Sequence, residues 1–140
     1  MHRQLSIKNK NGKDYVLCGW RHRYVRLTPE EWVRQQFLHT LVEQYGYPES
    51  LIAVEVQLAT KRRADAVVYT KELQPLVLIE FESEQVHLTQ QVLDQIAIYN
   101  KQFAVPYLIL CNGPEVVVAQ VQENKITFLQ NIPEWTQLLN

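Results

Sequence analysis

The segment Pro75–Glu82 constrains the fold of this 140-residue chain more than any other stretch. It begins as an apolar run and ends in two carboxylates, Glu80 and Glu82, which are two residues apart. An apolar run of this kind is typical of a strand covered on both faces, and residues two apart on a strand share a face. The sequence therefore predicts an internal strand that ends in two acids. Burying such acids is costly unless a basic side chain, a hydrogen-bond network or a metal ion compensates them.

A second acid-bearing strand lies upstream. Residues 62–69 are largely apolar, carry Asp65 near their beginning and follow a positive turn at residues 61–63. If this strand pairs with the strand of Glu80, then Asp65, Glu80 and Glu82 converge. We therefore expect a cluster of three carboxylates at one end of a sheet.

Two helices are predicted around these strands. Thr28 is suited to be the N-cap of the first, with Pro29 at the first helical position and Glu31 completing a capping box, and the apolar spacing ends near Gly46. The second runs roughly from residue 88 to residue 103. Its glutamines and tyrosine recur every four residues and project from one side; they are Gln91, Gln95 and Tyr99.

The remaining segments give coarser signals. Asn11-Gly12 predicts a peripheral hairpin, and residues 51–58 read as a half-buried strand with Ile52, Val54 and Val56 on one side. Residues 116–129 predict a terminal hairpin, and residues 133–139 a short closing helix. The order of helix, three strands, helix and strand predicts an α/β fold, a central mixed sheet with helices on its faces. We expect one domain over residues 1–140, with 1–27 peripheral and 28–121 as the core.

Composition bounds the function. With 14 Lys and Arg against 15 Asp and Glu, the formal charge is -1, so any contact with nucleic acid must come from a local patch. One basic run, at residues 20–26, is interleaved with aromatics; it suits phosphate and base stacking, or else it is a solvated connection. The two cysteines lack metal-type spacing and the histidines are unpaired, which argues against a zinc site. No apolar stretch reaches the roughly 20 residues of a membrane span, so we expect a cytoplasmic protein with reduced thiols.

Several motifs together resemble a known family, the N-terminal nuclease domain of type I restriction enzyme R subunits. The residues that carry the resemblance keep the family's order over about residues 23–113; they are Leu27–Gln35, Gly46–Pro48, Arg63–Asp65, Ile79–Glu80, Asp94–Asn100 and Cys111–Gly113. This family belongs to the PD-(D/E)XK nuclease superfamily. The resemblance implies a restriction-endonuclease-like αβα core and hydrolysis of phosphodiester bonds in DNA.

The resemblance also implies roles for individual residues. Asp65 is the first metal-binding acid, Glu80 the second, and Glu31 a helix-borne acid near the metal, while Gln95 and Tyr99 form an accessory motif. The implied cofactor is Mg²⁺ or Mn²⁺, which offsets the charge that develops on the phosphate and lowers the pKa of bound water. The expected DNA contacts are basic; they are Lys61, Arg62, Arg63 and Arg34.

Position 82 departs from the family pattern, because Glu82 stands where a lysine normally orients or activates the water. Three readings remain open. In the first, Glu82 acts as a base or an extra metal ligand. In the second, a basic side chain of residues 61–63 extends into the site in place of the lysine. In the third, the site is degenerate and the domain only binds. Without a metal, one of Glu80 and Glu82 should have a raised pKa, because like charges repel.

Each of these residues also has a structural interpretation. Glu31 is explained as a capping residue, Asp65 as an ion-pair partner of Arg62 or Arg63, and Glu80 as a structural ion pair. The glutamine and tyrosine positions are explained as a solvated helix flank.

Two function hypotheses follow. In one, the chain is a metal-dependent DNA endonuclease; in the other, it is a non-catalytic module of the same fold that binds DNA or a protein. The chain has no Gly-Lys-Ser/Thr phosphate loop, so ATP-driven translocation by this chain alone is excluded. Separate restriction-modification or motor subunits, and a homodimer, are left open as partners.

Overall fold

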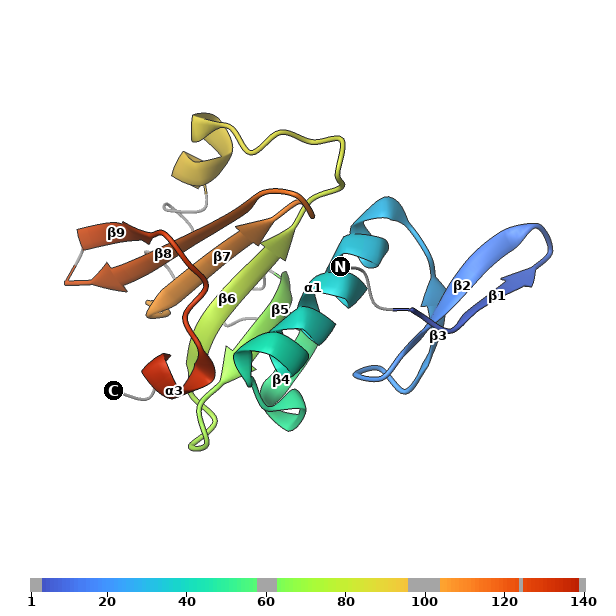
Figure 1. The fold of residues 1–140 in the computed structure, drawn as a ribbon, viewed down its shortest axis with the longest axis horizontal. Helices are drawn as coiled ribbons and strands as arrows, with labels where there is room; N and C mark the ends of the chain where they lie inside the picture. Colours follow the sequence, from blue (N-terminus) through green and yellow to red (C-terminus); the bar gives the residue numbers. More distant parts are fainter. Residues whose placement is uncertain (1–3, 58–62, 96–103, 124, 139–140) are drawn as a thin grey trace.

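The computed structural model describes residues 4–57, 63–95, 104–123 and 125–138, which form two sheets and four helical elements (Figure 1). The first sheet contains β1 (Ile7–Lys10), β2 (Lys13–Cys18) and β3 (Arg23–Arg26). The second contains β4 (Ile52–Gln57), β5 (Arg63–Tyr69), β6 (Pro75–Phe81), β7 (Tyr107–Cys111), β8 (Val116–Gln122) and β9 (Lys125–Leu129). The helical elements are α1 (Pro29–Tyr45), η1 (Glu49–Leu51), a helix at residues 90–95 and α3 (Trp135–Leu138).

The large sheet is mixed, as predicted. Its strands follow the order β4-β5-β6-β7-β8-β9, in which β6 and β7 are parallel and all other neighbours antiparallel. A parallel pair needs a long crossover connection, and here that connection carries the helix at residues 90–95. The mixed α/β class with a central mixed sheet is confirmed.

Two apolar cores lie on opposite faces of this sheet. Val77, Ile79 and Phe81 of β6 pack with α1, whereas Leu78 packs with Val92 and its neighbours in the crossover helix. The strand of Glu80 is thus buried on both faces, as its uninterrupted apolar run predicts. The layers are helix, sheet and helix, the αβα arrangement expected from the sequence.

Helix α1 begins and ends where its sequence indicates. The Thr28 hydroxyl accepts a hydrogen bond from the Glu31 backbone N–H at 3.1 Å, and Pro29 occupies the first turn. Gly46 ends the helix with a left-handed φ of 76°, and its N–H donates to the carbonyl of Leu41. Local chemistry alone therefore sets the bounds of this helix.

The small sheet extends the predicted N-terminal hairpin by one strand. Asn11 and Gly12, with φ of 54° and 79°, form the turn between β1 and β2, which is the conformation that Asn-Gly favours. Residues 23–26, which we read as part of a basic run, form the third strand β3. In Figure 1 this sheet stands on the far side of α1 from the large sheet.

The terminal hairpin is confirmed, but it is not a separate appendage. Strand β8 pairs with β7 and β9 pairs with β8, so the hairpin supplies the last two strands of the central sheet. The core sheet therefore extends past residue 121, where we expected the core to end.

The alternation predicted for residues 51–58 is wrong at one position. Val54 packs in the core beside α1, but Val56 packs in the opposite core. Glu55 lies between them with a φ of 53°, which interrupts the regular pleat, and the strand presents its other face beyond it. The partner strand changes face at the same level, between Ala66 and Ala64.

Both cysteines are buried and neither forms a disulfide. Burial raises the pKa of Cys111 to about 11, against a smaller lowering by the Gly113 backbone N–H. Among the described residues, no helix is both long and apolar enough to cross a membrane.

Gly46→Ala should lower the free energy of unfolding by about 1 kcal/mol, because a Cβ disfavours the left-handed conformation. Chemical denaturation measures this change. Gly19→Ala is the matched control, since an added Cβ there meets Glu49 only at an ordinary 3.6 Å. Equal losses in the two variants would contradict a specific role for the cap.

Candidate functional site

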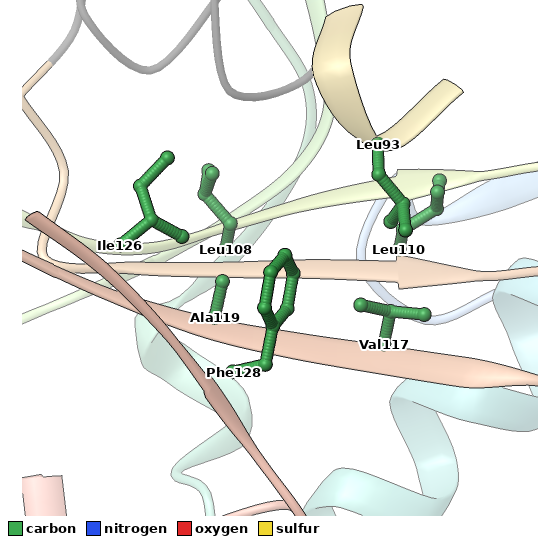
Figure 2. Close-up of a pocket in the computed structure, with 7 residues that line it drawn as sticks. All are labelled: Leu93, Leu108, Leu110, Val117, Ala119, Ile126 and Phe128. Atoms are coloured by element: carbon green, nitrogen blue, oxygen red, sulfur yellow. The ribbon is translucent and has the colours of Figure 1, made fainter. Parts of the chain in front are cut away.

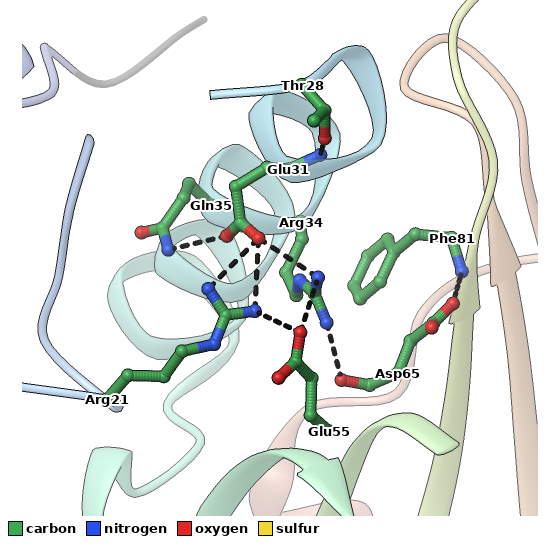
Figure 3. Close-up of polar contacts among 8 residues, drawn as sticks. All are labelled: Arg21, Thr28, Glu31, Arg34, Gln35, Glu55, Asp65 and Phe81. Atoms are coloured by element: carbon green, nitrogen blue, oxygen red, sulfur yellow. Dashed lines mark hydrogen bonds and ion pairs between the residues drawn. The ribbon is translucent and has the colours of Figure 1, made fainter. Parts of the chain in front are cut away.

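Asp65 lies where β5 and β6 stop pairing through their backbones. Their paired residues run from Tyr69 with Pro75 to Ala66 with Ile79, and one further step places Asp65 opposite Glu80. At this point the Oδ2 atom of Asp65 accepts the backbone N–H of Phe81 at 2.8 Å (Figure 3). The carboxylate is therefore oriented by the neighbouring strand, and it is partly exposed.

Glu80 and Glu82 follow at the same end of the sheet. Both side chains are partly exposed, and the Glu82 N–H donates to the Cys111 carbonyl at 2.9 Å, which continues the contact between β6 and β7. The expected three-carboxylate cluster is not formed: within the residues that the structure describes, no three His, Cys, Asp or Glu side chains are arranged to hold a metal ion. The acids share one end of the sheet without meeting at one point.

Glu82 nevertheless has an unfavourable electrostatic environment. Partial burial, and then the carboxylates of Asp65 and Glu30, raise the pKa of Glu82 above its ordinary value. A raised pKa on one of the two acids is what the sequence predicted. The charges responsible are those of Asp65 and Glu30, from other elements.

Glu31 is the centre of a buried ion cluster. Its Oε1 atom accepts hydrogen bonds from both Nη atoms of Arg21 and from Nη2 of Arg34, each at 3.0 Å, and its Oε2 accepts from Nε2 of Gln35 at 3.0 Å (Figure 3). The side chains of Arg21, Glu31 and Arg34 are 8, 5 and 12% exposed. Two guanidinium groups thus satisfy this carboxylate where the resemblance implied a metal ion.

The cluster extends to the strands beside Asp65. Glu55 approaches Arg21 at 3.3 Å and Arg34 at 3.7 Å, and Nη1 of Arg34 donates to the backbone carbonyl of Asp65 at 3.0 Å. Arg34, expected to contact DNA, is therefore engaged inside the protein. Its contacts fix the position of the Asp65 backbone relative to α1.

The other predicted site residues are less informative. Arg63 is exposed at the start of β5, and Gln95 is exposed at the end of the described part of its helix. Lys61, Arg62 and Tyr99 lie outside the described residues. The accessory pair of Gln95 and Tyr99 therefore stays a prediction.

Sequence reasoning missed three partners in this site, namely Arg21, Gln35 and Glu55. The spacing of four between Glu31 and Gln35 on one helix was an available signal. Arg21 and Glu55 had none, because they are 34 residues apart and Glu55 takes its position from an irregular strand.

An apolar hollow on the opposite face is not a competing site. Figure 2 shows its seven side chains; they are Leu93, Leu108, Leu110, Val117, Ala119, Ile126 and Phe128. Its volume is about 20 Å³, which is room for little more than one water, and no polar side chain lines it. It is a packing gap between the sheet and the crossover helix.

Glu31→Gln should lower the free energy of unfolding by about 3 kcal/mol, because Arg21 and Arg34 would then share a buried site without their central anion. Thermal and chemical unfolding measure the loss. Glu72→Gln is the matched control, since Glu72 is exposed and lies outside the cluster. A nearly neutral Glu31→Gln variant with weakened Mn²⁺ binding would instead indicate a metal ligand.

Glu82→Gln should raise the Tm of the metal-free protein at neutral pH. Because folding raises the pKa of Glu82, the folded protein favours the protonated carboxyl group. Wild type therefore loses folding stability as the pH rises through the folded pKa and Glu82 becomes charged. The gain over wild type should therefore shrink as the pH falls toward the unfolded pKa. The exposed Glu72→Gln variant should show no such pH-dependent gain, and a Glu82→Gln variant that matched it would contradict the crowding of carboxylates.

The fold has a relative among solved structures. It resembles the fragment structure of a putative HsdR subunit of a type I restriction enzyme from Vibrio vulnificus YJ016, with a TM-score of 0.53 and 16% sequence identity. The match covers 73% of this chain and 23% of that chain, so this chain spans under a quarter of its relative. No curated protein sequence matches.

A family model decides the classification. The model described as type I restriction enzyme R protein N terminus (HSDR_N) matches residues 29–133, which is most of the 140-residue chain and includes α1, the acid-bearing strands and the terminal hairpin. The motifs singled out in the sequence lie almost wholly within this range. The chain belongs to the family of type I restriction enzyme R protein N-terminal domains.

Proposed function

We propose that this chain is a metal-dependent DNA endonuclease domain of the restriction type. The observation that carries the proposal is the position of Asp65, whose carboxylate is oriented by the Phe81 N–H at the end of the sheet where Glu80 and Glu82 follow. Family membership supports the same assignment, because the matched region contains all three acids.

The residues present fit Mg²⁺ or Mn²⁺. Mg²⁺ is commonly held by one or two carboxylates together with waters and substrate phosphates, so a three-acid cluster is not required. In the proposal Asp65 and Glu80 would hold the ion, and Glu82 follows at the same end of the sheet, where burial and the carboxylates of Asp65 and Glu30 raise its pKa. When bound, such an ion neutralises charge on a scissile phosphate and lowers the pKa of attacking water.

The protein's own groups have distinct roles in this proposal. The Phe81 N–H orients the Asp65 carboxylate, and Arg34 holds the Asp65 backbone at a fixed distance from α1. We assign Glu31 to this support rather than to the metal, because its oxygens accept bonds from Arg21, Arg34 and Gln35. Glu82 occupies the position where the family pattern has a lysine, and in the proposal it would act as a base or as an extra ligand.

We propose partners on the same basis. DNA is the expected substrate, and the solved relative is a putative subunit of a type I restriction enzyme, which points to restriction enzymes as the setting. Because this chain spans 23% of that relative, motor and modification functions would reside in other segments or subunits. A homodimer stays open.

One specific observation favours the alternative, a non-catalytic module that binds DNA or a protein. Glu82 brings a negative charge where the family pattern has a cation, and Asp65 and Glu30 already crowd it. If no metal offsets this charge, the site retains the fold but cannot support hydrolysis.

Mn²⁺ and Mg²⁺ should bind wild type and raise its Tm, and Asp65→Asn should abolish both effects. Asn retains an acceptor for the Phe81 N–H while removing the charge, so folding is preserved better than with Ala. Calorimetric titration and thermal unfolding measure binding. A plasmid and single-strand cleavage assay, with and without EDTA, measures activity, and Glu80→Ala should abolish cleavage.

Asp94→Asn is the matched control, because Asp94 is exposed on the crossover helix, and it should behave as wild type. Absence of metal binding in wild type would contradict the proposed metal site. Metal binding without cleavage would favour the non-catalytic module, and cleavage gained by Glu82→Lys would identify position 82 as the cause.

A further inference from the structure

The basic residues of this chain are concentrated in its first segment. Residues 1–27 contain seven of the 14 Lys and Arg residues but one of the 15 acidic residues, Asp14. The remaining 113 residues contain the other seven basic residues and 14 acids. With His neutral, the near-zero total charge hides a positive N-terminal segment and a negative body. A charge asymmetry of this size is a recognised sign of an interaction with a polyanion.

The strand register assigns most of this charge to one face of the small sheet. Val16 faces Ile7 and Val25 across the ladders, and Val16, Cys18 and Val25 on the face that they share form a small core. The acid Asp14 pairs with Asn9 and accepts a hydrogen bond from its side chain at 3.0 Å, so it lies on this same inner face.

The opposite face, here called the basic sheet face, is formed by Lys8, Lys10, Lys13, Tyr15, Leu17, Tyr24 and Arg26. Its four cationic residues are exposed, and Leu17 is 43% exposed. The Lys8 Nζ lies 4.0 Å from the centre of the Tyr24 ring, which places these two side chains together on this face. No acidic residue belongs to it, since Asp14 is the one acid of the segment.

The basic sheet face is continuous with the candidate site. Tyr15, Tyr24 and Arg26 line an open hollow of about 420 Å³, and Glu31, Arg34 and Glu55 line the same hollow. Arg34 in turn contacts the Asp65 carbonyl. A polymer lying on the face can therefore continue through the hollow toward the acids at the end of the large sheet.

A simple structural role does not account for this surface. Lysines on the edge strand β1 would discourage edge-to-edge pairing, and that explains Lys8 and Lys10. Protection of the edge does not explain the cations on β2 and β3 or the lack of acids. A surface that serves only solubility usually carries both positive and negative side chains. Cations interleaved with tyrosine rings are the combination that binds a phosphate backbone and stacks on bases.

We propose that the basic sheet face binds the sugar-phosphate backbone of DNA and directs the strand through the hollow to Asp65. This deepens the proposed function by assigning the surface that holds the substrate. Charge complementarity commits the proposal to DNA, since the acidic body of the chain would repel a phosphate polymer elsewhere.

The test measures DNA binding by fluorescence anisotropy in EDTA, over a series of salt concentrations, with a duplex and a single-stranded oligonucleotide. Lys8→Gln/Lys10→Gln should weaken binding and reduce the slope of log K against log salt by about 2, because each lost phosphate contact removes about 0.9 for duplex DNA. Lys71→Gln/Lys125→Gln is the matched control. It removes the same charge from exposed positions on the body and should keep the wild-type slope.

Equal slopes in the two double variants, or no binding of DNA by wild type, would overturn the proposal. The proposal would also be overturned if the basic sheet face bound vesicles of acidic lipid but did not bind DNA. Circular dichroism checks that the exposed substitutions leave the fold intact. DNA binding is measured in EDTA, so its outcome does not depend on the metal site. If wild type binds DNA through this face but, in the separate assays, neither binds Mn²⁺ nor cleaves DNA, this inference is supported and the nuclease proposal is contradicted.

Discussion

The structure depends on one carboxylate, that of Glu31. It accepts bonds from Arg21 in the β2–β3 connection and from Arg34 on its own helix, while Glu55 of β4 approaches both guanidinium groups. One buried anion thereby joins the small sheet, α1 and the edge of the large sheet. Buried ion pairs contribute little net stability, but losing one member is costly, so the cluster favours one relative placement of these elements.

That placement determines what the acids at the end of the sheet can do. Arg34 connects Glu31 to the Asp65 backbone, and the Asp65 carboxylate accepts the N–H of Phe81. At the same end of the sheet, partial burial and then the carboxylates of Asp65 and Glu30 raise the pKa of Glu82. A cation at this end of the sheet would relieve the crowding, which is the physical basis of the proposed metal site. The basic sheet face, which shares a hollow with Arg34 and Glu55, offers a surface of opposite sign.

Much of the fold could be read from local chemistry. Thr28, Pro29 and Gly46 bound α1, Asn11-Gly12 turns the first hairpin, and the apolar strand before Glu80 is buried on both faces. These features depend on residues close in sequence, whose preferences act before any tertiary contact forms. The candidate site was predicted less completely. Asp65, Glu80 and Glu82 share one end of the sheet, yet they do not form the expected cluster.

The sequence by itself determined the order of elements, the class of fold and the family resemblance, because periodicity, caps and motif order are local properties. Only the tertiary structure decided that the Glu31 carboxylate binds Arg21 and Arg34, and that the side chains of β4 before and after Glu55 pack on opposite faces of the sheet. It also decided that the N-terminal cations share one side of a sheet. Each of these depends on strand register or on contacts between distant segments, and the pairing of a charge cannot be read from its position in the chain.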